Sequence, residues 1–305
     1  MNSLTKVMVS PHIHNGKSTA GIMRDVLIAL LPVTVAGAII FGLTALIPVA
    51  VCVISCVAFE AIFNMITKRA QTVSDLSAAV TGLLLGLNLP ANIPLWQCVV
   101  GSLFAIVIVK CIFGGIGFNI VNPAITARVF MLVAFESLAI SAFPVDAVAG
   151  ATPLSSGEMP SLMTAFLGNY GGSIGETCTV ALLAGGIYLL VRKVITWHIP
   201  AVFIGTVFVF SLFVTGFDAV GALGLTMVGG VFIGAIFMAT DYVTSPFTAW
   251  GKVIYAFGAG LLTCLIRYFG IYPEGVSFAI LFMNILTPYI NEWTKHNVFA
   301  MGGKK

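Results

Sequence analysis

Residues 46–66 read LIPVAVCVISCVAFEAIFNMI, an apolar run with a single charged side chain, Glu60. A helix of about 20 apolar residues crosses the bilayer core and satisfies its own backbone hydrogen bonds. A strand of a membrane barrel would instead alternate polar and apolar residues. The run therefore predicts a transmembrane helix, and similar runs recur along the whole chain.

The composition places the rest of the chain in the same class. Of the 305 residues, 59% are hydrophobic and 8% are charged, whereas about a quarter of the residues in soluble proteins are charged. Mean hydropathy is +1.08. The net charge of +3 arises without a basic cluster, so we expect contacts with membrane lipid and none with nucleic acid. These properties indicate an all-α membrane protein.

The apolar runs predict about ten transmembrane helices. Two of them are weak, because the third is short and ends in Asn88-Leu89-Pro90 and the fifth has Asn119, Asn122, Pro123 and Arg128 in its first half. Broken helices at membrane depth are tolerated where protein or a cavity surrounds the backbone. The predicted spans are 25–43, 46–66, 76–90, 95–112, 118–140, 177–191, 199–215, 221–240, 253–271 and 275–292.

Basic residues predict the orientation of these helices. Residues 141–176 contain no Lys or Arg, and such loops tend to lie outside the cytoplasm. We expect a multi-pass protein of the cell (inner) membrane with cytoplasmic termini, no removable signal peptide and an extracytoplasmic 141–176 loop. Lys110 is then expected at a cytoplasmic helix end, and Glu176 is expected to face outward.

The two halves of the chain resemble each other. Gly101 precedes Lys110 by nine residues, and Gly258 precedes Arg267 by the same number. Because five is an odd number of crossings, a second five-helix unit must have the opposite orientation in the membrane. Such inverted repeats commonly place a ligand site at their interface. The predicted organisation has five parts. They are a cytoplasmic segment (1–24), a first five-helix repeat (25–140), the loop (141–176), a second five-helix repeat (177–292) and a cytoplasmic tail (293–305).

The loop contains the run DAVAGATP at residues 146–153. Its only hydroxyl belongs to Thr152, and Gly150 and Ala151 keep the neighbouring side chains small. Taken alone, the run is also typical of an ordinary turn.

Several motifs together resemble the RnfD/NqrB family over essentially the whole chain. The first half is similar to it in SDLSAAVTGLLLGL at 74–87, Phe-Gly-Gly at 113–115 and Asn-Pro-Ala at 122–124. The second half is similar in FMATDYVTSP at 237–246 and IRYFGIYPEG at 266–275. The length of 305 residues favours the Rnf type over the longer quinone-linked type.

This resemblance implies a membrane subunit of a ferredoxin:NAD⁺ oxidoreductase complex that moves Na⁺ or H⁺. Its partners would be the other membrane and iron–sulfur or flavin subunits of the complex. It further implies FMN attached to Thr152 by a phosphoester bond, which a separate flavin transferase forms at a motif like Asp-Gly-x-Ser/Thr-Gly-Ala-Thr. Asp146, Gly150, Ala151 and Thr152 match that motif, whereas Ala147 and Ala149 depart from it.

The resemblance also implies a second, non-covalent flavin such as riboflavin between the repeats. Asn122, Arg128, Thr240 and Asp241 are the candidates to line its cavity. Arg128 has an alternative role as the partner of a carboxylate such as Glu136 or Glu60, because a charge inside a span seldom faces lipid. No catalytic residue or metal site is expected in this chain.

Two other functions fit the same pattern. A five-plus-five inverted bundle also builds channels and solute transporters, and a membrane subunit can serve only to hold redox partners in place. Covalently bound flavin distinguishes electron transfer from both. The residues do not predict Na⁺ or H⁺ as the coupling ion, because hard-cation sites use scattered oxygens without a spacing signature.

Overall fold

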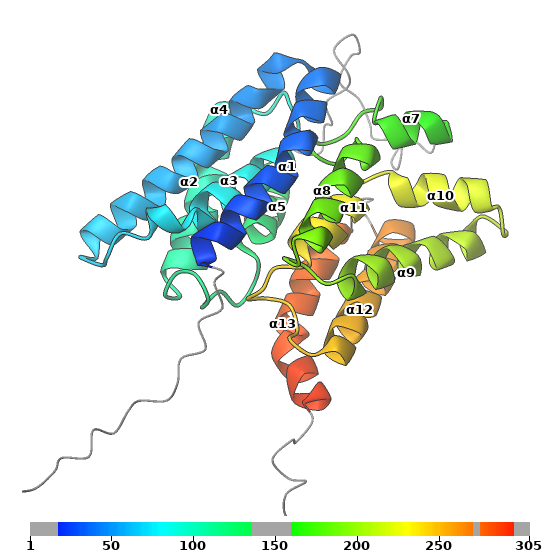
Figure 1. Ribbon diagram of the computed structural model, residues 1–305. Coiled ribbons are helices and arrows are strands. Elements are labelled where there is room, and N and C mark those ends of the chain that lie inside the picture. The colour runs from blue at the N-terminus through cyan, green and yellow to red at the C-terminus, as the bar shows by residue number, and fades with distance from the viewer. Residues whose placement is uncertain (1–17, 136–159, 271–274, 296–305) are drawn as a thin grey trace, which may run out of the picture.

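The computed structural model describes residues 18–135, 160–270 and 275–295, and its regular elements in these ranges are all helical. The helices of the first half, from blue to cyan-green in Figure 1, lie beside those of the second half, from green to red. The first half contains α1 (Thr19–Phe41), η1 (Leu43–Ala45), α2 (Leu46–Ile66), η2 (Val73–Asp75), α3 (Ser77–Leu87), α4 (Leu95–Leu103), the π-helix η3 (Phe104–Cys111) and α5 (Pro123–Ala134).

The described part of the second half begins with a short helix and ends with two long ones. It contains α7 (Leu162–Leu167), α8 (Thr179–Val191), α9 (His198–Val214), α10 (Ala219–Met227), α11 (Val231–Ile233), the π-helix η5 (Gly234–Met238), α12 (Ala249–Phe269) and α13 (Val276–Thr294). Each of the ten predicted spans therefore coincides with at least one helix.

Among the described residues, three helical segments are long and apolar enough to cross a membrane. They are Thr19–Phe41, Leu43–Ile66 and Ala249–Phe269. A fourth candidate is the pair Ala219–Met227 and Val231–Met238, which is bent by 67°. Most of the other predicted spans are shorter apolar helices.

Two predicted spans do not form continuous helices over their predicted length. The span predicted at 221–240 is broken at Val228–Gly230, where Gly229 has a φ of +80° that glycine adopts readily. The span predicted at 118–140 begins only at Pro123, because the side chain of Asn122 caps the helix by accepting from the backbone N–H groups of Ala124 and Ile125. The break at Val228–Gly230 is enclosed by protein, since these three residues are buried, whereas Phe118 and Ile120, just before α5, are exposed.

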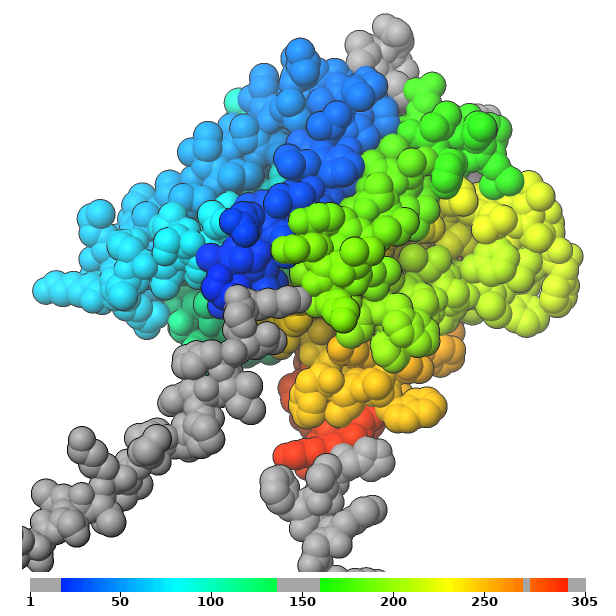
Figure 2. Space-filling view, in the orientation of Figure 1, coloured from blue at the N-terminus to red at the C-terminus, as the bar shows by residue number. Residues whose placement is uncertain are grey.

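Helix packing follows the same plan in both halves. In the first half α2 packs against α3 and α4, and in the second half α9 packs against α10 and α12. The two halves meet where α1 packs on α8, which Figure 2 shows on the visible face, and where α5 packs on α13.

Matching glycines support this plan. A Cβ at Gly101 of α4 would lie 2.1 Å from the sulfur of Met131 on α5, and a Cβ at Gly258 of α12 would lie 2.7 Å from Cε of Met283 on α13. In each half a glycine of the fourth helix therefore accommodates a methionine of the fifth.

The described part of the predicted outward loop is not a surface loop. Residues 162–167 form α7, and Ser173, Ile174 and Glu176 are buried. Glu176, which was expected on the outer side, has its side chain enclosed by protein. The carbonyls of Leu87 and Leu89 at the end of α3 accept hydrogen bonds from this segment, which draws it into the bundle.

Candidate functional site

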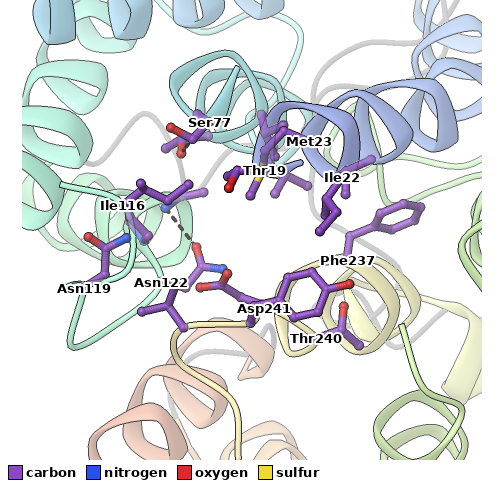
Figure 3. A pocket seen from close by; sticks show the side chains of 18 of the residues that line it. Thr19, Ile22, Met23, Ser77, Ile116, Asn119, Asn122, Phe237, Thr240 and Asp241 are labelled. Atoms are coloured by element: carbon purple, nitrogen blue, oxygen red, sulfur yellow. Dashed lines mark hydrogen bonds between the residues drawn. The ribbon is translucent and has the colours of Figure 1, made fainter. Parts of the chain in front are cut away.

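A cavity of about 410 Å³ lies between the two halves of the chain. Figure 3 shows Ile22 and Met23 of α1 on one side and Phe237 of η5 on another. Val80, Leu84 and Leu189 add further apolar wall. Its lining also includes residues that begin α1 and α3 and residues that follow η3, α8 and η5.

Three of the four residues predicted to line such a cavity do so, namely Asn122, Thr240 and Asp241. They come from opposite halves and converge in Figure 3. Asn122 joins the halves directly, because its Nδ2 donates to the carbonyl of Met238 over 3.2 Å. The sequence motifs at 122–124 and 237–246 thus meet at one wall.

The polar groups of this wall are held in place locally. Thr240 Oγ1 donates to the carbonyl of Ile236 over 2.6 Å, and Thr244 Oγ1 donates to Oδ2 of Asp241 over 3.0 Å. Burial raises the pKa of the Asp241 carboxyl, and the hydroxyl of Thr244 counteracts this shift.

Asn119, which was predicted only to weaken the fifth span, is a further cavity residue. Its Oδ1 is buried and has no hydrogen-bond partner among the described residues. Buried acceptors are normally satisfied, so this oxygen lacks a partner that most buried oxygens have. The signal in the sequence was its position three residues before Asn122, after the glycine-rich turn.

Lys110 and Ser77 form a polar corner of the same cavity. Lys110 Nζ lies 3.0 Å from both carboxylate oxygens of Glu60 and donates to Ser77 Oγ over 2.5 Å. Lys110 has 2% of its side-chain surface exposed. Lys110, which was expected at a cytoplasmic helix end, therefore has its ammonium paired inside the protein.

Arg128 is not among the residues that line the cavity, which corrects the prediction. Its Nη1 donates to Oδ1 of Asn88 over 2.6 Å, and its Nη2 lies 3.9 Å from Oε2 of Glu176. The alternative role as a partner of a carboxylate is confirmed, with Glu176 as the partner. Glu60 pairs with Lys110, and Glu136 lies outside the described residues.

The predicted flavin-attachment run also lies outside the described residues. This applies to Asp146, Gly150, Ala151 and Thr152.

Comparison with known proteins finds one family over nearly the whole chain. The model of the NQR2, RnfD, RnfE family matches residues 6–300. The D subunit of the Na⁺-translocating ferredoxin:NAD⁺ oxidoreductase complex of Acetobacterium woodii is 47% identical, covering 99% of this chain and 97% of that protein.

Two further relatives are similar along their length. The D subunit of the proton-translocating ferredoxin:NAD⁺ oxidoreductase complex of Clostridium ljungdahlii is 41% identical over 94% of this chain and 93% of that protein. The D subunit of the ion-translocating oxidoreductase complex of Halorhodospira halophila is 33% identical over 97% of this chain and 96% of that protein.

Proposed function

The chain belongs to the NQR2, RnfD, RnfE family, and we propose that it is the D subunit of an ion-translocating ferredoxin:NAD⁺ oxidoreductase complex. Its partners are the other membrane and iron–sulfur or flavin subunits of that complex. The observation that carries this proposal is the 47% identity over 99% of the chain to the D subunit of such a complex. The chain contributes to the redox reaction by holding flavin, and ferredoxin and NAD⁺ bind to other subunits.

Thr152 is the proposed attachment site of FMN. Its hydroxyl would carry the phosphoester bond formed by a flavin transferase, and Asp146, Gly150 and Ala151 would form the motif that the transferase recognises. The support is the match of these four residues to the family motif and the absence of Lys and Arg from 141–176, which favours the outer face.

The cavity between the halves is the proposed site of a second, non-covalent flavin such as riboflavin. Its volume of about 410 Å³ lies in the range of small-molecule sites, and its apolar walls suit a flat aromatic ring. Asn122, Thr240 and Asp241 offer hydrogen bonds at one wall, and the Oδ1 of Asn119 needs a donor. A bound flavin would supply one- or two-electron redox chemistry.

For the membrane arrangement we propose ten crossings in two inverted five-helix repeats. The support is the repeated packing of α2 and α9 on their neighbours and the matched contacts Gly101 to Met131 and Gly258 to Met283. Both termini would lie in the cytoplasm of the cell, and residues 141–176 would lie outside.

The decisive experiment is intact mass spectrometry with in-gel flavin fluorescence on protein co-expressed with a flavin transferase. We expect one FMN on the wild-type chain, retained after denaturation, and none on Thr152→Val. Wild-type protein without FMN despite an active transferase would contradict the proposed attachment site.

A channel or solute transporter is the second candidate function. The observations in its favour are the cavity between the halves and the helix break at Val228–Gly230, since such breaks often line transport sites. Flux of a solute into liposomes that contain this protein alone, without bound flavin, would favour this candidate.

The coupling ion is open to a direct test, because the first two relatives named above differ in it. If Na⁺ is the coupling ion, liposomes that contain the complex should accumulate Na⁺ while ferredoxin reduces NAD⁺, and a protonophore should not prevent this accumulation. A protonophore-sensitive pH gradient identifies H⁺.

A further inference from the structure

Asn284 is a buried polar residue of α13, with 1% of its surface exposed. One orientation of its carboxamide satisfies three neighbours at once. Its Oδ1 then accepts from the backbone N–H of Asn122 over 3.2 Å, and its Nδ2 donates to Tyr255 Oη over 2.7 Å and to the carbonyl of Thr244 over 3.3 Å. Buried polar groups are normally hydrogen-bonded, and this orientation of Asn284 meets that requirement.

Two of these neighbours come from opposite halves of the chain. Asn122 caps the start of α5 in the first half, and Thr244 lies between η5 and α12 in the second half. The helix that carries Asn284 packs against both α5 and η5. A single carboxamide therefore joins the two segments that meet at the polar wall of the cavity.

Both of these hydrogen bonds lead to a side chain of the cavity. Asn122 lines the cavity itself, and its Nδ2 donates to the carbonyl of Met238 over 3.2 Å. Thr244 Oγ1 donates over 3.0 Å to Oδ2 of Asp241, which also lines the cavity. The carbonyl of Thr244 accepts a second hydrogen bond from Thr287 Oγ1 over 2.8 Å. This carbonyl is thus held twice from α13.

We infer that Asn284 is a positioning residue for the cavity, whose carboxamide fixes Asn122 and Asp241 relative to each other across the boundary between the halves. The inference rests on the proposed flavin site. Asn284 is not among the residues that line the cavity, so it acts through Asn122 and Thr244. A site whose polar groups are already in place binds its ligand more tightly, because less has to be ordered on binding.

The test uses Asn284→Leu, which keeps a side chain of similar size and removes both polar atoms. Riboflavin is titrated into the purified full chain after bound flavin has been removed, and quenching of its fluorescence gives the dissociation constant. This constant should rise at least about tenfold, since buried groups of the cavity wall lose their partner. In the flavin-free protein, the amide hydrogen of Asn122 should exchange at least about tenfold faster, because its acceptor is gone.

Two variants control this experiment. Thr263→Val removes a buried hydrogen bond of 2.7 Å to the carbonyl of Ala259, away from the cavity lining, and should leave the dissociation constant and the exchange at Asn122 as in the wild type. Asn284→Asp, as a buried neutral acid, offers one acceptor and one donor in the same place. It should recover most of the riboflavin affinity, which a side chain that merely fills space would not do.

A wild-type dissociation constant or wild-type exchange at Asn122 in Asn284→Leu would overturn the inference. An equal loss of affinity in Thr263→Val would also overturn it, because the effect would then follow from general stability. Wild-type protein that does not bind riboflavin would instead contradict the proposed flavin site. The exchange measurement on flavin-free protein would still decide whether Asn284 holds Asn122 in place.

Discussion

The Nζ atom of Lys110 lies 3.0 Å from both carboxylate oxygens of Glu60, and 2% of each side chain is exposed. This pair joins η3 to α2 inside the first half of the chain. Ser77 Oγ accepts from the same ammonium and donates to Oδ1 of Asp75. The ammonium and the Glu60 carboxylate therefore compensate each other within one hydrogen-bonded network at the corner of the cavity.

Breaking this pair from one side should destabilise the protein strongly. Lys110→Met leaves the Glu60 carboxylate buried and unpaired, so we expect the free energy of unfolding to fall by about 3–5 kcal/mol. The double variant Lys110→Met/Glu60→Gln should show a clearly smaller loss of unfolding free energy. Thermal unfolding in detergent measures both, and equal losses would show that the charges do not stabilise each other.

The close contact of α3 with α2 should depend on Gly86. A Cβ there would lie 2.8 Å from Cα of Val49, and backbone yields less readily than a side chain. Gly86→Ala should lower the unfolding free energy by about 1–3 kcal/mol. Gly205→Ala on α9 is the matched control, because nothing lies within 4 Å of its Cβ. The control should be neutral or should stabilise by up to about 1 kcal/mol, as measured by the same melts.

The orientation of the 141–176 loop can be tested by labelling. A cysteine at Ser155 should react with a membrane-impermeant thiol reagent added to intact cells, because the segment lacks basic residues. A cysteine at Thr196, between α8 and α9, should react only after the membrane is opened. The reverse pattern would invert the proposed topology.

Thr152→Ser separates the need for a hydroxyl from the need for threonine. The serine retains a hydroxyl that can accept the flavin phosphate, so some covalent FMN should remain, whereas Thr152→Val should carry none. The free energy of unfolding of both variants should lie within about 0.5 kcal/mol of the wild-type value, which is the usual range for surface substitutions. Thr164→Val is the control, and loss of FMN from this control would move the attachment site there.

Asn119 should contribute to retention of the non-covalent flavin. Asn119→Ala removes the unpartnered Oδ1, and the loss of about 1–2 kcal/mol of binding corresponds to roughly 5- to 30-fold weaker affinity. Flavin released after denaturation of purified protein, counted per chain, gives the occupancy. Gln71→Ala, at an exposed position, should leave it unchanged. Full occupancy in Asn119→Ala at low flavin concentration would rule out a contact with Oδ1.

The amino-acid sequence by itself determined the membrane-type helices, because each apolar run is long and its ends carry polar or glycine residues. The predicted span 46–66 coincides with α2. Asn122, Thr240 and Asp241, which the family resemblance implied as cavity residues, do line the cavity between the halves.

Only the tertiary structure decided which buried charges are partners. Glu60 was an expected partner for Arg128, yet the packing of α2 against η3 places it beside Lys110, and the segment before α8 brings Glu176 to Arg128 instead. The break at Val228–Gly230 was likewise hidden within a continuous apolar run. Hydrophobicity along a chain determines how much of a helix is buried, whereas the partner of each buried polar group depends on which helix faces meet, and that is a property of the assembled bundle.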